Sequence, residues 1–182
     1  YRLINNLILS KKHVRKKNDK KNILIFLGGS DLHNFQLKLY NKICKENLYK
    51  NYKFYFFIGP GVKKKLLYFK KKNIFFFNKY EKLRLIVQDT FCVICNGGNA
   101  MFEMLQLKIP CLAIPTSSQE KANVLFFKKK GIILQFSFKK KLLSQISFFY
   151  KIKHQKLFIS NCEKYFGKLD IEKALKKAFL NI

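Results

Sequence analysis

The chain has 182 residues, 48% of them hydrophobic and 16% aromatic, which suits one domain with a substantial core and excludes a disordered chain. Its 38 Lys and Arg against 10 Asp and Glu give a net charge of +28. Almost all of that charge is lysine beside abundant Asn, Ile and Phe, whereas Arg, which reads bases and phosphates in bidentate geometry, is scarce. We therefore expect solvated lysine faces and no specific nucleic-acid partner, and peripheral contact with an anionic membrane stays open.

Cysteine usage points to a reduced, cytoplasmic protein. The five cysteines are an odd number, and most lie inside apolar runs, where a thiol behaves as a small hydrophobic group. Cys92 and Cys95 form a CxxC pair, but residues three apart on a strand point to opposite faces, so metal or redox pairing is not expected. We expect no signal peptide, and no apolar run approaches the roughly 18 residues of a membrane span. We expect no metal and no cofactor.

Apolar runs without alternation are typical of buried strands, and they follow residues 1–21. We interpret 1–21 as a linker from a missing N-terminal domain and 22–182 as the folded domain. The expected strands are 22–27, 53–58, 73–77, 91–95, 111–114 and 132–135. The expected helices are 35–48, 62–70, 80–87, 100–107, 119–130, 138–150, 155–166 and 171–180. This order predicts a Rossmann-like α/β domain, in which helices flank a parallel sheet of about six strands, with extra C-terminal helices.

Small polar loops follow several of these strands, at 28–31, 59–61, 96–99 and 115–119. Ligands of parallel sheets bind beyond the carboxyl ends of the strands, so these loops are expected to share one binding edge.

The loop at Gly97, Gly98 and Asn99 has the character of an anion site. Two glycines allow unusual backbone angles and a close approach to a ligand, and Asn99 is a good N-cap for the helix expected from Ala100. The free N–H groups of a helix N-terminus favour phosphate. Glu103 lies one turn later, where it could reach past the phosphates to a ribose diol or could merely favour the helix dipole and face solvent.

The loop formed by Gly28, Gly29, Ser30 and Asp31 has two interpretations. It could make a second phosphate or sugar contact, with Asp31 on a hydroxyl group, or it could be an ordinary turn in which Asp31 caps the next helix. His33 nearby is more often a solvated side chain than a general base.

Three segments carry a family resemblance: ILIFLGGSD (23–31), NGGNAMFEMLQLKIPCLAIP (96–115) and QEKANVLFFKKKGIIL (119–134). Together they resemble the C-terminal half of GT-B-fold nucleotide-sugar enzymes. They most resemble the UDP-sugar hydrolases of pseudaminic acid biosynthesis, which release UDP from UDP-2,4-diacetamido-2,4,6-trideoxy-β-L-altropyranose and are similar to glycosyltransferase family 28. The resemblance covers about 1–134, and its most specific element is the spacing GG-x(4)-E-x(6)-P.

The resemblance implies a division of roles among the candidate residues. Gly97, Gly98 and Asn99 would lie against the UDP phosphates, and Glu103 would bind the ribose. Residues at the sugar side of the cleft would be Gly28, Gly29, Ser30, Asp31 and Gln119. The catalytic residues, which remain unknown, are expected in the N-terminal domain of such hydrolases.

Four functions therefore compete. The first is the UDP-sugar-binding half of a hydrolase, and the second is the donor-binding half of a family 28-like glycosyltransferase. The third is a binding half that works with a separate N-terminal partner chain, and the fourth is a basic nucleic-acid-binding domain.

Overall fold

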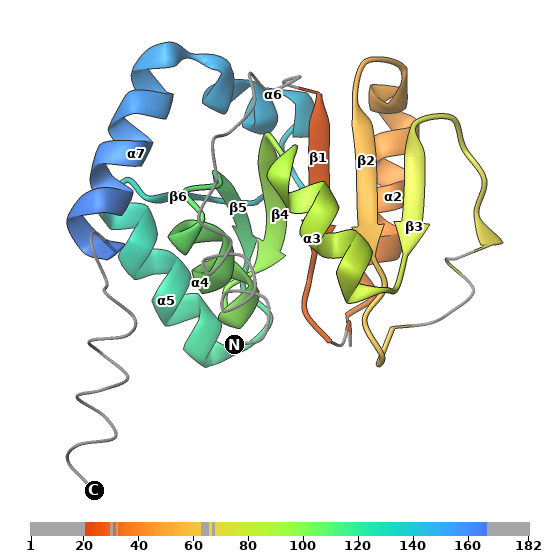
Figure 1. The fold of residues 1–182 in the computed structure, drawn as a ribbon, viewed down its shortest axis with the longest axis horizontal. Helices are drawn as coiled ribbons and strands as arrows, with labels where there is room; N and C mark the ends of the chain where they lie inside the picture. The colour runs from red at the N-terminus through yellow and green to blue at the C-terminus, as the bar shows by residue number, and fades with distance from the viewer. Residues whose placement is uncertain (1–20, 30, 32, 63–65, 67, 167–182) are drawn as a thin grey trace, which may run out of the picture.

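The computed structural model describes residues 21–29, 31, 33–62, 66 and 68–166. Six parallel strands form one sheet in the order β3-β2-β1-β4-β5-β6 (Figure 1). The strands are β1 (Asn22–Phe26), β2 (Lys53–Phe57), β3 (Ile74–Phe77), β4 (Cys92–Asn96), β5 (Cys111–Ile114) and β6 (Ile133–Gln135). The predicted Rossmann-like parallel sheet flanked by helices is confirmed.

The helices mostly follow the strands in alternation. They are α2 (Phe35–Lys45), η1 (Leu48–Lys50), α3 (Tyr80–Gln88), α4 (Asn99–Gln106), α5 (Ser118–Lys129), α6 (Leu142–Ser147), η3 (Phe148–Tyr150) and α7 (Ile152–Phe166). The expected linker 1–21, except Lys21, and the expected helix 171–180 lie outside the described residues. No described helix is long and apolar enough to cross a membrane.

The sheet changes direction of growth between β1 and β4. The chain builds β1, β2 and β3 outward to one side and then returns to place β4, β5 and β6 on the other, with Ile25 paired to Ile94 across the centre. At such a switch point the loops after the two central strands diverge to opposite faces and leave a crevice at the carboxyl edge. The fold thus places one potential binding site between the β1–α2 and β4–α4 loops.

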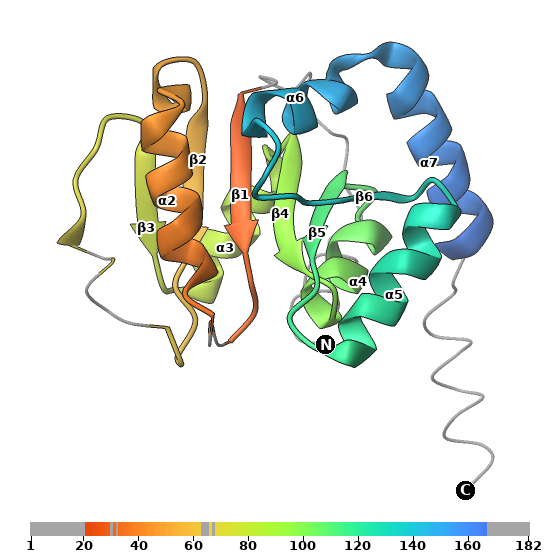
Figure 2. The same ribbon diagram turned by 180° about the vertical axis from the view of Figure 1, so that it is seen from behind.

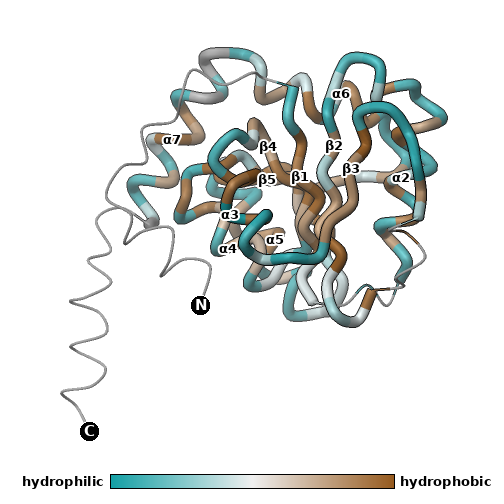
Figure 3. The backbone as a smooth tube through the Cα atoms, turned by 45° about the vertical axis from the view of Figure 1, so that its right-hand side comes forward, coloured by the Kyte–Doolittle hydropathy of each residue, from teal (hydrophilic) through white to brown (hydrophobic). Residues whose placement is uncertain are grey.

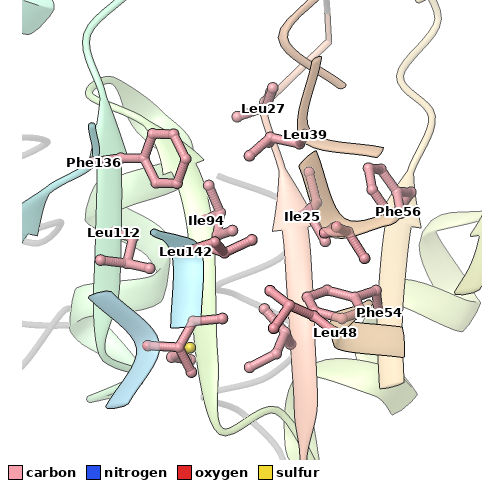
Figure 4. Close-up of a cluster of buried hydrophobic side chains, with 14 of the residues drawn as sticks. Ile25, Leu27, Leu39, Leu48, Phe54, Phe56, Ile94, Leu112, Phe136 and Leu142 are labelled. Atoms are coloured by element: carbon pink, nitrogen blue, oxygen red, sulfur yellow. The ribbon is translucent and has the colours of Figure 1, made fainter. Parts of the chain in front are cut away.

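Alternate residues of each strand enter two cores, one on each face of the sheet. Helices α2 and α6 cover one face (Figure 2), where Ile25, Leu39 and Phe56 are fully buried (Figure 4). The opposite face carries α3, α4, α5 and α7. Cys92 lies in the first core and Cys95 in the second, which confirms that the CxxC thiols point to opposite faces.

Hydropathy follows this layering. The strands at the centre are hydrophobic along their length, whereas the helices alternate between hydrophobic and hydrophilic residues (Figure 3). A strand buried on both faces has no polar side, so the uninterrupted apolar runs of the sequence match their positions in the sheet.

The predicted helices at 62–70 and 138–150 differ most from the structure. The prediction of a helix at 62–70 is wrong for the described residues, because Leu66 and Tyr68 lie in a 3-10 turn and Phe69 and Lys70 in no helix. Gly61 offers no capping side chain for a helix that starts at Val62. The lysines at 63–65 and at 70–72 would also repel one another in such a helix.

The predicted helix 138–150 begins only at Leu142. Gln145 reaches back to bind Ser137, accepting its N–H at 2.8 Å and donating to its carbonyl at 3.0 Å, which favours a turn before the helix. The first turn of α6 is capped from another element, because the Glu46 carboxylate accepts the N–H of Leu142 at 2.8 Å and that of Leu143 at 3.4 Å. Tertiary hydrogen bonds therefore set this boundary.

Candidate functional site

The β1–α2 loop and the loop after β2 are in close backbone contact at the carboxyl edge. The N–H of Gly61 donates to the carbonyl of Gly29 at 2.7 Å. A Cβ atom on Gly59 would lie 2.5 Å from the Gly28 carbonyl oxygen, so the contact requires glycine there. Gly28 adopts φ of +80°, a conformation that glycine accepts without steric cost, and a Cβ there would lie 3.7 Å from the Asn96 amide nitrogen. These loops therefore border the end of β4.

Gly97 and Gly98 serve close packing in this structure. A Cβ on Gly97 would lie 2.6 Å from Val124 Cγ2, and one on Gly98 would lie 2.7 Å from Glu120 Oε1. Neither glycine has positive φ. Gly98 has φ of −105° and ψ of −142°, outside the helical and extended regions, and the missing side chains of the pair let α5 approach the β4–α4 loop.

The N-terminus of α4 presents unpaired donors at this edge. The Gly98 carbonyl accepts the first helical hydrogen bond, from Met101 N at 3.0 Å. In the described part of the chain, no acceptor contacts the backbone N–H of Asn99 or Ala100. The N-cap is Gly98 and not Asn99 as predicted, because Asn99 is already the first helical residue; its side chain is exposed. The orphan N–H groups of such a helix start attract anions.

Glu103 lies on the same face of α4 as Asn99. The two residues are four positions apart, which places their side chains one above the other on a helix. Glu103 is half-buried, whereas Asn99 is exposed. The structure thus has a carboxylate one turn beyond the free N–H groups, the arrangement that the sequence predicts.

Asp31 caps α2. Its two carboxylate oxygens accept the N–H groups of Phe35 and Gln36, each at 2.8 Å. The geometry matches the interpretation of this loop as a helix-capping turn, although each carboxylate oxygen keeps a second acceptor position. Ser30, the other polar residue of this predicted site, lies outside the described residues.

Gln119 is exposed in the first turn of α5, while its neighbour Glu120 points into the site. Glu120 Oε1 accepts a hydrogen bond from Asn96 Nδ2 at 2.7 Å. Its Oε2 accepts the N–H of Thr116 at 2.8 Å and the hydroxyl of Thr116 at 2.6 Å. One carboxylate therefore joins the loops after β4 and β5.

Two further contacts tie the loops together. His33 Nε2 lies 3.3 Å from the Thr116 carbonyl oxygen, so the β1–α2 loop reaches the loop after β5. Asn123 of α5 donates to the Gly97 carbonyl at 3.2 Å. The strand ends at 28–29, 59–61, 96–98 and 115–117 thus form one continuous edge.

Sequence reasoning placed Asn96 and Thr116 in loops of the binding edge without giving either a role, and it missed Glu120. A signal for one of them was present, because Ser117 and Glu120 have the S-x-x-E spacing of a capping box, and Ser117 Oγ does accept the Glu120 N–H at 3.2 Å. In a capping box the glutamate returns to the N-cap N–H, whereas here it binds Thr116, one residue earlier. That choice depends on the neighbouring loop and not on local sequence.

The buried thiols do not extend the chemistry of this edge. Burial raises the pKa of Cys92 and Cys111 well above the ordinary value and that of Cys162 to about 12, so these groups stay protonated. Among the described residues there is no group of three or more side chains able to hold a metal ion.

No protein-family profile matches the sequence, and no curated protein does either. Solved structures with a similar fold include glycosyltransferases. The glycosyltransferase SnogD from Streptomyces nogalater aligns with TM-score 0.66 and 16% identity over 89% of this chain and 44% of its own. The spinosyn rhamnosyltransferase SpnG, complexed with thymidine diphosphate, has TM-score 0.61 and 14% identity over 84% of this chain and 42% of its own.

A third similar structure is Os79 from O. sativa in complex with UDP, with TM-score 0.59 and 14% identity over 85% of this chain and 37% of its own. The chain therefore spans less than half the length of each of these proteins. Its sheet and helices have the fold of the C-terminal domain of a GT-B enzyme.

Proposed function

We propose that this domain binds the nucleoside diphosphate of a UDP-sugar at its carboxyl edge. The observation that carries the proposal is the start of α4, beside the topological switch of the sheet, where the N–H groups of Asn99 and Ala100 have no acceptor among the described residues. A diphosphate would accept these donors and would be stabilised by the helix dipole. Glu103, one turn later, would accept hydrogen bonds from the ribose hydroxyls.

The sugar would lie toward the β1–α2 loop and α5. Gly28 and Gly29 present backbone without side chains there, and Asp31, Ser30 and Gln119 are the polar candidates from the sequence. Asp31 would act through the remaining acceptor positions of a carboxylate that already caps α2. Its first task in the proposed site is to fix the direction of that loop.

The reaction that we favour is hydrolysis of a UDP-sugar in pseudaminic or related nonulosonic acid synthesis. The support is the spacing GG-x(4)-E-x(6)-P from Gly97 to Pro110 and the resemblance of the surrounding segments. Water would attack the anomeric carbon, the bond from that carbon to the UDP oxygen would break, and the α4 N-terminus would stabilise the departing UDP. The water-activating group would come from an N-terminal domain or a partner chain in the cytoplasm.

The second candidate is transfer of the sugar to an acceptor, as in a family 28-like glycosyltransferase. The similar solved structures are glycosyltransferases, which favours this reading. In that case the lysine-rich surface could hold the enzyme at an anionic membrane that carries the acceptor.

Calorimetry with UDP tests the shared part of both candidates. We expect micromolar affinity for the 182-residue chain and a loss of about tenfold or more in Glu103→Ala, since a charged hydrogen bond to the ribose is removed. Wild-type protein should prefer UDP to 2′-deoxy-UDP, and the variant should lose that preference. Glu163→Ala is the matched control, because Glu163 pairs with Lys108 just beyond the opposite end of α4. No UDP binding by the wild-type chain would refute the site.

A product assay separates the two reactions. The protein with its N-terminal domain, incubated with a UDP-diacetamido-trideoxyhexose in water, should release UDP and free sugar if it is a hydrolase. UDP release that requires an added acceptor would support transfer.

A further inference from the structure

We infer that Glu120 is a positioning residue that sets the phosphate-binding turn of this site by locking the β4–α4 loop to the β5–α5 loop. The inference rests on the proposed nucleotide site, whose donors belong to α4. Glu120 would act through protein groups and not through the nucleotide, because both of its carboxylate oxygens bind Asn96 or Thr116.

The hydrogen bonds of Glu120 run in two directions. Oε1 accepts from Asn96 at the end of β4, and Oε2 accepts from both the N–H and the hydroxyl of Thr116 after β5. Glu120 is itself held by Ser117, whose hydroxyl accepts its N–H. Because three donors at 2.6 to 2.8 Å converge on one half-buried carboxylate, its orientation is fixed.

The carboxylate lies directly beside the turn that would carry phosphate. A Cβ on Gly98, the N-cap of α4, would be 2.7 Å from Glu120 Oε1. The next residues are Asn99 and Ala100, whose N–H groups are the proposed phosphate donors. A displacement of Glu120 would therefore change the direction of those donors, and hydrogen bonds weaken steeply once the donor angle is lost.

Asn96 depends on Glu120 for its orientation. Its Nδ2 donates to Glu120, whereas its Oδ1 is buried without a hydrogen-bond partner among the described residues. An amide with one satisfied end can turn over if its neighbour becomes a donor. Glutamine at position 120 could thus keep the bridge, with its amide nitrogen donating to the reversed Asn96.

The charge of Glu120 and its hydrogen bonds have opposite effects on the affinity for UDP. The negative charge of Glu120 repels a diphosphate at the α4 N-terminus, whereas its hydrogen bonds hold the donors in place. If positioning is the role, Glu120→Gln should bind UDP as tightly as wild type or more tightly. Glu120→Ala should bind UDP about tenfold or more weakly than wild type, because the hydrogen bonds that join the two loops disappear.

The experiment is UDP calorimetry on the full chain, with a rescue built into it. Asn96→Asp sets two carboxylates against each other and should weaken UDP binding at least about tenfold. In the double variant Asn96→Asp with Glu120→Gln, the glutamine amide donates to the new aspartate, and affinity should return to within about threefold of wild type. Recovery by a second substitution is not expected from two independent losses of stability.

Glu46→Ala is the matched control. Glu46 also joins two elements by accepting backbone N–H groups, but it does so between the C-terminal end of α2 and the start of α6. This variant should lower the melting temperature and leave UDP affinity unchanged. Equal UDP affinity in wild type and Glu120→Ala, or no recovery in the double variant, would overturn the inference.

Two further outcomes are failure of the wild-type chain to bind UDP and failure of Glu120→Ala to fold. Absence of UDP binding in the wild-type chain would refute the proposed function and, with it, the basis of the positioning role. If Glu120→Ala does not fold, Thr116→Val, which removes only the hydroxyl donor to Oε2, decides the matter: unchanged affinity contradicts the inference, and a loss of about threefold or more supports it.

Discussion

Gly97 and Val124 are packed so closely that a single added carbon would not fit between them. A Cβ on Gly97 would lie 2.6 Å from Val124 Cγ2 and 2.8 Å from the Glu120 carbonyl oxygen. Val124 is fully buried on α5, so neither the side chain nor the helix backbone can yield without cost. The closeness of α5 to the β4–α4 loop therefore depends on this glycine.

Gly97→Ala should lower the free energy of unfolding by about 1 to 3 kcal/mol through overpacking. Urea unfolding followed by circular dichroism measures the change. Gly29→Ala is the matched control, because a Cβ there would meet none of the described residues within 4 Å and Gly29 does not have positive φ. A cost for Gly97→Ala no larger than that of Gly29→Ala would contradict the packing account.

Asp31→Ala should destabilise the protein by about 0.5 to 2 kcal/mol, the usual cost of losing a helix N-cap side chain. The reason is the pair of hydrogen bonds from Phe35 N and Gln36 N to its carboxylate. Asp31→Asn retains one acceptor and should recover part of the loss. Equal unfolding free energies for wild type and Asp31→Ala would show that the cap contributes nothing measurable.

Stability should decrease above about pH 9. Burial raises the pKa of Cys92 and Cys111 above their ordinary 9.0, so the unfolded chain releases these protons first. The contribution is fully present below the unfolded pKa and is lost as pH rises, by roughly 1.4 kcal/mol per pH unit for each such thiol. Urea unfolding at pH 8 to 11 measures the slope.

A Cys111→Ala variant isolates that effect. Lysine deprotonation alters wild type and variant alike, so the difference between their pH slopes belongs to the thiol. The variant should lose less stability per pH unit above pH 9. Parallel slopes would mean that the Cys111 thiol does not contribute.

The strands were predictable because each is an uninterrupted apolar run that glycine or polar residues end, as with Ile23 to Leu27 before Gly28. The start of α6 could not be predicted from the sequence, because Gln145 and the distant Glu46 determine it through hydrogen bonds.

In the candidate site, too, local features could be predicted from the sequence and contacts between distant segments could not. Glycine spacing and helical periodicity predict a glycine pair before a helix that carries Glu103, and in the structure Gly97 and Gly98 precede α4 while Glu103 lies in its second turn. The packing role of Gly97 and the bridge through Glu120 arise only when α5 docks against the β4–α4 loop. Such contacts between segments far apart in sequence leave no local pattern to read.

The pairing of β1 with β4 has a consequence for how the domain assembles. Strands β1 to β3 and β4 to β6 each form from consecutive chain, whereas Ile25 must find Ile94 across the whole first half. Closing so long a segment costs more entropy than the neighbouring pairings, so this seam is expected to form late in folding. A nucleotide that contacts both halves of the sheet would slow the separation of β1 from β4. Unfolding rates should then be lower with UDP than without it.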